Sequence, residues 1–115
     1  MKLVIAIIRE IQLDQVREAL IDAEIRRITV TRVSGHGQLV DEEIYRGKKV
    51  VPGLIPKVKV EIAVNDEFVE ITVNTIIKAV KAKDLAGKTG DGKIFIMPLE
   101  DCIRIRTEER GGAGI

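Results

Sequence analysis

The chain has 115 residues, 32% of them charged, and a formal net charge of +1. This length suits one domain spanning 1–115, and the near-neutral balance excludes a general attraction to nucleic acid or to an anionic membrane surface. An aromatic content of 3% is too low for a platform on which single-stranded nucleic acid stacks. With no apolar run approaching the roughly 20 residues that span a bilayer, no signal-peptide pattern and one cysteine, the sequence is typical of a cytoplasmic protein that does not insert into membranes.

The first half of the chain predicts a strand, a helix and a second strand. Residues 2–9 (KLVIAIIR) are apolar on both faces, which is typical of a strand covered on both sides. Residues 13–25 carry apolar side chains at helical spacing, and Asp14 is a candidate N-cap. Residues 28–33 (ITVTRV) are rich in β-branched side chains and predict a strand. The polar stretch that follows, up to about Pro56, is too long for an ordinary hairpin loop.

A strand followed by a helix comes next. Apolar and charged side chains alternate in residues 57–64 (KVKVEIAV), so the apolar side chains face one way and the lysines and glutamate face the other. A second helix is expected to start at Asn65 and Asp66. The apolar stripe of this helix is predicted to consist of Val69, Val73, Ile76, Ile77 and Val80.

The remaining segments complete the predicted fold. Residues 94–97 (IFIM) read as a strand, residues 102–107 (CIRIRT) alternate like another, and residues from about 107 to 115 read as a loose tail. The order β-α-β-β-α-β is that of the ferredoxin-like α+β fold. Two helices cover only one face of such a sheet, yet the strands at 3–8 and 94–97 are apolar on both faces. The sequence therefore predicts a homo-oligomer packed sheet against sheet, because a large apolar face would otherwise remain in water.

A glycine-rich stretch, Gly87–Lys93 (GKTGDGK), lies directly before the strand at 94–97. It matches the first seven positions of the P-loop pattern, but Ile94 stands where Ser or Thr should hold magnesium, and the stretch leads into a strand instead of a helix. Glycines still allow main-chain N–H groups to converge on an anion, and a lysine adds positive charge. The stretch by itself leaves two interpretations open, a phosphate site and a flexible turn.

Several segments, in the right order, resemble the PII signal-transduction proteins: AIIRE, LDQVREAL, TVTRVSGHG, EIYRG, PKVKVEI, TIIKAV, TGDGKIF and IRIRTEERG. The resemblance implies a homotrimer of ferredoxin-like subunits that binds ATP or ADP in clefts between neighbouring subunits. In many members 2-oxoglutarate binds beside Mg-ATP. A long loop after the second strand, the T-loop, here about 37–55, is implied to contact a protein target such as a membrane ammonium channel or a nitrogen-metabolism enzyme or regulator.

The resemblance also assigns roles to individual residues. The phosphates would lie against Gly90, Asp91, Gly92 and Lys93. The purine and ribose pocket would be shaped by Ile7, Thr29, Gly35, Gly37, Glu61 and Ala63. Arg104 and Arg106 match arginines that reach the phosphates from the adjacent subunit, and the alternation in IRIR puts both on one face of the expected strand. Gln38 resembles the glutamine that coordinates magnesium, and Gln38 and Lys57 match positions that bind 2-oxoglutarate. The target-facing loop would present Glu42, Glu43, Tyr45, Arg46, Lys48 and Lys49.

The T-loop segment departs from the pattern of these relatives. The segment from Gly37 to Tyr45 is one residue shorter than usual, and the run QLVDEE lacks the glycine that usually follows the glutamine. Its N–H groups therefore turn less freely toward a small dicarboxylate, and we expect 2-oxoglutarate binding to be weak or absent. Val50 stands where many bacterial members carry a uridylylated tyrosine, so control by that modification is not expected.

Other side chains offer weaker chemistry. His36 is the single histidine and makes a poor metal site alone, Cys102 in its apolar segment is expected to be a buried structural thiol, and Glu42–Glu43 suit a charged loop better than an acid/base pair. Two classes of function follow. One is a non-enzymatic regulator that senses adenylates, with or without 2-oxoglutarate or another small anion. The other is a small ATP-using enzyme, which would need a positioned base and an acceptor site that the sequence does not display.

Overall fold

The computed structural model describes residues 1–36, 43–45, 48–50, 53–82 and 92–115. The strands are β1 (Lys2–Arg9), β2 (Thr29–Gly35), β3 (Glu43–Tyr45), β4 (Lys48–Val50), β5 (Ile55–Val64) and β6 (Lys93–Pro98). The α-helices are α1 (Leu13–Asp22) and α2 (Val69–Ala82), and the 3₁₀ turns are η1 (Glu10–Gln12), η2 (Asp66–Phe68) and η3 (Gly111–Gly114).

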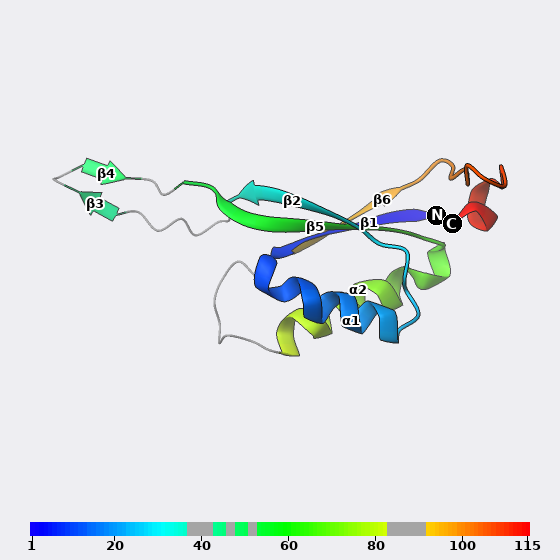
Figure 1. Ribbon diagram of the computed structural model, residues 1–115, viewed down its shortest axis with the longest axis horizontal. Helices are drawn as coiled ribbons and strands as arrows, with labels where there is room; N and C mark the ends of the chain where they lie inside the picture. Colours follow the sequence, from blue (N-terminus) through cyan, green and yellow to red (C-terminus); the bar gives the residue numbers. More distant parts are fainter. Residues whose placement is uncertain (37–42, 46–47, 51–52, 83–91) are drawn as a thin grey trace.

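Four strands form one antiparallel sheet in the order β2-β5-β1-β6. The helices α1 and α2 lie side by side on one face of it, and no helix in the described part of the chain covers the other face (Figure 1). This arrangement confirms the predicted ferredoxin-like α+β fold. β1 is central, because it pairs with β5 along one edge and with β6 along the other.

The core lies between the sheet and the helices. Alternate residues of β1 and β5 are buried, and they pack against one side of each helix. The predicted inward set of β5 is confirmed, since Val58, Val60, Ile62 and Val64 are all buried. The apolar side chains buried in this core are Val4, Ala6, Ile8, Val16, Leu20, Val58, Val60, Ile62, Val64, Ile76, Ala79 and Val80.

The predicted stripe of α2 is only partly correct. Ile76 and Val80 are buried and Val69 and Val73 pack against the core, but Ile77 is 38% exposed. Its expected place is taken by Thr72, which is fully buried and whose hydroxyl donates to the main-chain oxygen of Phe68 at 2.7 Å. Because the Thr72 hydroxyl has a hydrogen-bond acceptor one helical turn earlier, a polar side chain can be buried there. Hydrophobicity alone would have placed Ile77 in the core instead of Thr72.

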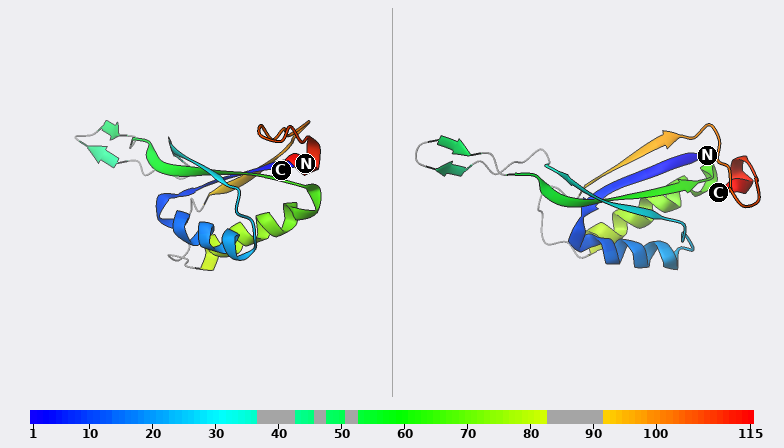
Figure 2. Two further views of the ribbon diagram at one scale, coloured as in Figure 1. Left: turned by 45° about the vertical axis from the view of Figure 1, so that its right-hand side comes forward. Right: turned by 45° about the horizontal axis from the view of Figure 1, so that its top comes forward.

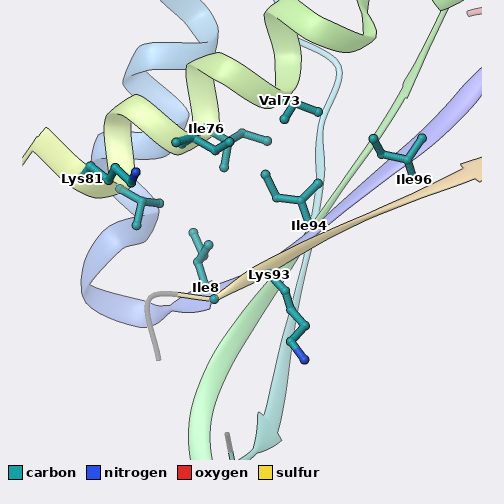
Figure 3. Close-up of a pocket in the computed structure, with 10 residues that line it drawn as sticks. Ile8, Val73, Ile76, Lys81, Lys93, Ile94 and Ile96 are labelled. Atoms are coloured by element: carbon teal, nitrogen blue, oxygen red, sulfur yellow. The ribbon is translucent and has the colours of Figure 1, made fainter. Parts of the chain in front are cut away.

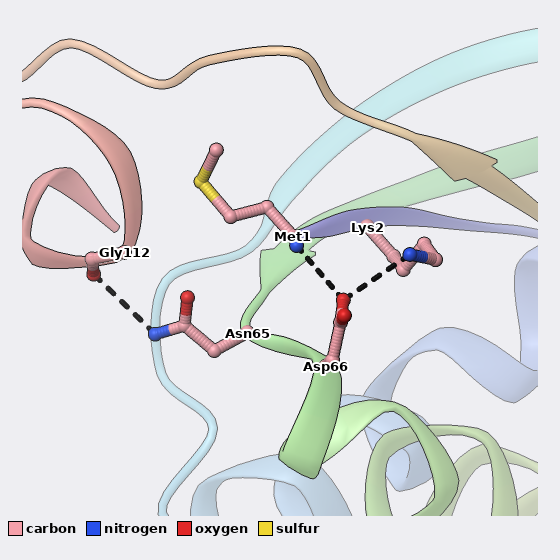
Figure 4. Close-up of polar contacts among 5 residues, drawn as sticks. All are labelled: Met1, Lys2, Asn65, Asp66 and Gly112. Carbon is pink, nitrogen blue, oxygen red and sulfur yellow. Dashed lines mark hydrogen bonds and ion pairs between the residues drawn. The ribbon is translucent and has the colours of Figure 1, made fainter.

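The helix starts differ from the expected caps. Asp14 does not cap α1; it lies in the first turn and pairs with Arg17 across 3.4 Å. The chain turns into the helix through Gln12, whose Oε1 accepts a hydrogen bond from the Arg9 N–H at 3.0 Å. After Asn65, where the second helix was expected to start, the chain enters the 3₁₀ turn η2 at Asp66, and α2 itself begins at Val69. The Asn65 amide makes no cap and donates to the Gly112 main-chain oxygen (Figure 4).

The ends of the described chain meet near the start of α2. Asp66 accepts hydrogen bonds from the Met1 amino group at 2.8 Å and from Lys2 Nζ at 3.2 Å (Figure 4). The bond from the amino group, followed by that from Lys2, holds the pKa of Asp66 below its ordinary value of 3.8. The main-chain N–H of Leu99 also donates to the Met1 oxygen at 3.1 Å.

The expectations of a strand at 102–107 and of a loose tail after it are wrong. Residues 101–110 form a tight turn closed by a bridge between Ile103 and Arg110, and none of the described strands pairs with them. Asp101 accepts bonds from the Cys102 and Gly111 N–H groups at 2.8 and 3.0 Å and pairs with Arg110. These contacts, the Cys102 N–H first, lower the pKa of Asp101 from its ordinary value of 3.8.

The tail itself is folded. It forms η3, in which Gly114 is buried and a Cβ would lie 2.7 Å from the main-chain oxygen of Cys102. Cys102 is only partly buried and belongs to none of the strands described, so the expected buried strand thiol is also corrected.

Candidate functional site

The face of the sheet turned away from the helices is the candidate site. Side chains alternate along a strand, and residues paired across antiparallel strands point to the same face. The register therefore assigns to this open face Leu3, Ile5, Ile7, Arg9, Thr29, Thr31, Val33, Lys57, Lys59, Glu61, Ala63, Lys93, Phe95 and Met97.

The open face has an apolar part and a charged part. Phe95 and Met97 of β6 are 48% and 51% exposed and are paired with Ile5 and Leu3, which confirms that the sheet has an apolar surface on the side without helices. The charged part lies toward β2. Here Lys59 and Glu61 of β5 form an ion pair across 3.5 Å, and their side chains are 35% and 28% exposed.

Most of the pocket residues assigned from sequence meet on this face. Thr29, Glu61 and Ile5 occupy one cross-strand row, and Thr31, Lys59, Ile7 and Lys93 occupy the next. Ala63 follows Glu61 on the same side of β5. The structure thus brings Ile7, Thr29, Glu61, Ala63 and Lys93 together from four strands.

The remaining assigned residues lie at the end of the sheet or outside the described part of the chain. Gly35 pairs with Ile55 where β2 ends and β5 begins. Lys57 lies two residues further along β5 and pairs with Arg9, the last residue of β1. Gly37, Gln38, Gly90 and Asp91, with Glu42 and Arg46 of the expected target-facing loop, fall outside the described residues.

Gly92 connects the glycine-rich stretch to the open face through a close main-chain approach. Its φ is +114°, and a Cβ built on it would lie 2.0 Å from the main-chain oxygen of Ile7. Only glycine fits a position with this dihedral angle and this contact. The glycine therefore holds the start of β6 directly beside one of the assigned pocket residues.

Lys93, the next residue, points to the open face. Figure 3 shows its side chain on the opposite side of β6 from Ile94 and Ile96, which face α2. Between α2 and β6 lies a mostly apolar cavity of about 340 Å³, whose apolar lining comes from isoleucines and valines of α2, from isoleucines of β6 and from Ile8 of β1. The Lys93 ammonium is thus directed away from this cavity and toward the charged part of the open face.

Arg104 and Arg106 are not on a common strand face, which corrects the sequence expectation. Arg106 is an exposed turn residue. Arg104 is partly buried; its Nη2 donates to the main-chain oxygen of Ile115 at 3.0 Å, and its Nη1 lies 3.7 Å from the Glu109 carboxylate. β6 is six residues long and spans about 17 Å, and it separates this C-terminal turn from Gly92 and Lys93 at its other end (Figure 1). Within one chain, the two arginines therefore do not meet Gly92 and Lys93.

The target-facing loop contains a short hairpin that the sequence did not reveal. β3 and β4 pair with Tyr45 opposite Lys48 and Ile44 opposite Lys49, and Glu43 starts the first strand. The hairpin projects beyond the end of the main sheet, far from both helices (Figure 2). Four of the six residues assigned to target contact thus belong to one projecting element.

Sequence reasoning passed over two residues, Lys59 on the open face and Glu109 beside Arg104. Lys59 was assigned no role, although the alternation of charges in residues 57–61 was an available signal. Glu109 had no signal, because its contact with Arg104 depends on the turn between them. Within the described ranges, no cluster of three potential metal-ligating side chains occurs, and none of the helices is long and apolar enough to cross a membrane.

The sequence matches the family described as "Nitrogen regulatory protein P-II" over residues 1–109. This chain belongs to the P-II family. It is 49% identical to nitrogen regulatory protein GlnK1 of Methanosarcina mazei, 46% to nitrogen regulatory protein P-II 1 of Escherichia coli K12 and 44% to nitrogen regulatory protein P-II of Azospirillum brasilense. These alignments cover all of this chain and 97%, 100% and 100% of the respective relatives.

P-II proteins are signal-transduction regulators of nitrogen metabolism, and the relatives of this chain given above are all named nitrogen regulatory proteins. The predicted family is therefore confirmed, and with it the interpretation as a regulator of target proteins in place of a small ATP-using enzyme.

The Gly92 contact makes a direct prediction about stability. In Gly92→Ala, the strained φ alone should cost about 1–3 kcal/mol, and displacing the Ile7 oxygen should add to this. Gly53→Ala is the matched control, because its Cβ would have no atom within 4 Å; a change below about 1 kcal/mol is expected there. Urea unfolding followed by circular dichroism at one protein concentration measures both. Equal midpoints for the two variants would contradict the close approach.

Proposed function

We propose that this chain is a P-II regulator that binds ATP and ADP in clefts between the subunits of a homotrimer and controls a target protein through the loop at about 37–55. The observation that most supports the proposal is the open sheet face. On it, Ile7, Thr29, Glu61, Ala63 and Lys93 lie together although they come from four strands. A purine and ribose need such a surface with both apolar and hydrogen-bonding groups.

A second subunit supplies what one chain lacks. The apolar part of the open face is half exposed in the single chain, and burying it between subunits is favourable. The C-terminal turn with Arg104 follows the far end of β6, a strand about 17 Å long that starts at Lys93. A cleft that joins these residues is therefore built across an interface, with the arginines donated by the neighbouring subunit.

The described residues fit a phosphate group. Gly92 presents a main chain without a side chain beside β1, and Lys93 directs its ammonium toward the open face (Figure 3). In the proposed cleft, Gly90, Asp91, Gly92 and Lys93 surround the phosphates from one subunit while Arg104 and Arg106 approach from the other. Gln38 would hold the magnesium ion, which neutralises phosphate charge when bound.

Regulation then follows from differences in affinity. ATP and ADP change the output only if they bind the loop conformations unequally. The β3–β4 hairpin projects from the body, and the loop that contains it is the proposed contact with a protein target. A membrane ammonium channel or a nitrogen-metabolism enzyme is the proposed class of target, and the cytoplasmic location expected from the sequence agrees with either.

Calorimetric titration with ATP, ADP and AMP, followed by a turnover assay, tests the proposal. Competitive binding of ATP and ADP at one site per subunit, without turnover coupled to a product, is the expected result. An absence of adenylate binding in a correctly assembled protein would overturn it.

The open face predicts the state of assembly. The mass in solution at micromolar concentration should be about three times the 12.7 kDa of one chain, as measured by light scattering. Phe95→Glu should dissociate the assembly, because it places a charge in the buried apolar contact. Phe68→Glu on η2 is the control, since Phe68 is equally exposed at 50% but lies on the helical side. A monomeric wild-type protein would contradict the proposed clefts.

Arg104 predicts a second effect. Arg104→Ala should weaken ATP binding by about 1.5–3 kcal/mol, the usual loss for a hydrogen bond to a charged group, although the glycine-rich stretch is intact. Arg17→Ala removes an exposed arginine of α1 and should leave the affinity unchanged. Calorimetry on trimeric preparations measures both. Equal affinities in wild type and Arg104→Ala would mean that the phosphates are held differently.

The third prediction concerns 2-oxoglutarate. Because the run QLVDEE is short and lacks a glycine, titration of 2-oxoglutarate into the Mg-ATP complex should show weak or no binding, and adenylates should be the main input. Lys57 remains on the open face beside Arg9 and could pair with one carboxylate. Micromolar binding that disappears in Lys57→Ala would instead identify an ordinary 2-oxoglutarate sensor.

A further inference from the structure

Arg104 already has two partners within its own chain. Its Nη2 donates to the main-chain oxygen of Ile115 at 3.0 Å, and its Nη1 lies 3.7 Å from a carboxylate oxygen of Glu109. The two side chains are 31% and 45% exposed. The guanidinium is therefore accessible to a ligand, but both of its terminal nitrogens face oxygen atoms of residues 109–115, which are called the C-terminal segment below.

The main chain, and not the Glu109 carboxylate, holds the turn that brings these groups together. The Arg104 N–H donates to the Glu109 oxygen at 3.0 Å, and the Glu108 N–H donates to the Arg104 oxygen at 2.7 Å. The Glu109 N–H reaches the Thr107 hydroxyl at 3.4 Å. In the described part of the chain, the one contact recorded for the Glu109 carboxylate is the ion pair with Arg104. Its charge is thus available to act on Arg104 without supporting the fold.

The Ile115 oxygen is held in place by a second arginine. Arg27, in the connection between α1 and β2, donates to the same oxygen at 3.0 Å. The Asn65 amide reaches Gly112 in the same segment, and Asp101 accepts from the Gly111 N–H. The C-terminal segment therefore keeps its oxygens beside Arg104 through contacts that do not involve Arg104 itself.

We propose that Glu109 and the Ile115 oxygen compete with a nucleotide phosphate for Arg104, and that they thereby lower the affinity of the cleft for adenylates. The proposal rests on the function proposed above, in which Arg104 contacts the phosphates. A phosphate oxygen that approaches Nη1 comes close to the Glu109 carboxylate, and like charges repel. A phosphate oxygen that takes over Nη2 has to displace the Ile115 oxygen, which lies 3.0 Å from it.

The competition couples two parts of the molecule. Because linkage is reciprocal, a phosphate that draws Arg104 away removes one of the two arginine contacts of the Ile115 oxygen, and a stronger contact between Arg104 and Glu109 or Ile115 lowers nucleotide affinity. Glu109 thus sets the concentration range over which the protein responds to ATP and ADP.

The test compares Glu109→Gln with Glu108→Gln by calorimetric titration of ATP and of ADP. Both variants lose one negative charge at neighbouring positions, but in the described structure no ion pair involves Glu108. Glu109→Gln should bind each nucleotide about two- to fivefold more tightly than Glu108→Gln, the range that corresponds to an exposed ion pair. The difference should shrink when the salt concentration is raised from about 50 to 500 mM, because exposed charges are screened.

The outcomes separate this inference from the proposed function. If no variant, wild type included, binds an adenylate, both fail. If wild type binds and Arg104→Ala weakens binding while Glu109→Gln equals Glu108→Gln, the function stands and the competition is overturned. Circular dichroism and light scattering check folding and assembly, and Glu109→Ala read against Glu108→Ala repeats the comparison. Loss of folding in both Glu109 variants would also overturn the inference, because it would show that the carboxylate supports the turn.

Discussion

The constraint on which the structure depends is that two helices cover only one face of a four-stranded sheet. Alternate residues of β1 and β5 pack against α1 and α2 and form the core. The residues between them lie on the open face, a surface of half-exposed apolar and charged groups. Because side chains alternate strictly along each strand, the core and the open face are formed by alternate residues of the same strands. The two faces therefore cannot change register independently. A change of one residue in register would exchange them.

The open face acquires chemistry from a few local departures from regular structure. Gly92 allows the main chain to approach the Ile7 oxygen where any side chain would be excluded. The next residue then begins β6 with its ammonium on the open side (Figure 3). Beyond the other end of β6, the Asp101 carboxylate accepts hydrogen bonds from two main-chain N–H groups and fixes the turn that carries Arg104. The strand thus separates Gly92 and Lys93 from the turn that carries Arg104.

The sequence was sufficient for the parts of the fold that depend on alternation or on helical spacing. β5 was predicted correctly because the valines of its Lys-Val-Lys-Val pattern lie in the core and the lysines lie on the open face. Alternation misled at residues 102–107, since the Ile-Arg-Ile-Arg pattern pairs with none of the described strands and folds into a turn. Thr72 was passed over because hydrophobicity does not register a hydroxyl that is satisfied inside its own helix.

The candidate site was predictable where residues share a strand face and unpredictable where they depend on a turn. Ile7, Thr29 and Glu61 follow from the register once the strand order is known. The contact between Arg104 and Glu109 requires the geometry of the turn at residues 101–110, which no periodicity encodes. The β3–β4 hairpin was missed because short polar strands resemble a loop in composition.

The central place of β1 also bears on how the chain acquires this structure. β1 is the first strand in sequence, but one of its edges pairs with β6, so that Leu3 lies opposite Met97. Closing a loop of this length costs entropy that is regained only when the pairing forms. β1, β5 and β2 can pair as soon as residue 64 is available, whereas the second edge of β1 stays open until almost the whole chain has been synthesised. During that interval the unpaired edge of an apolar strand is exposed to neighbouring chains. Pairing with β6 then covers this edge of β1.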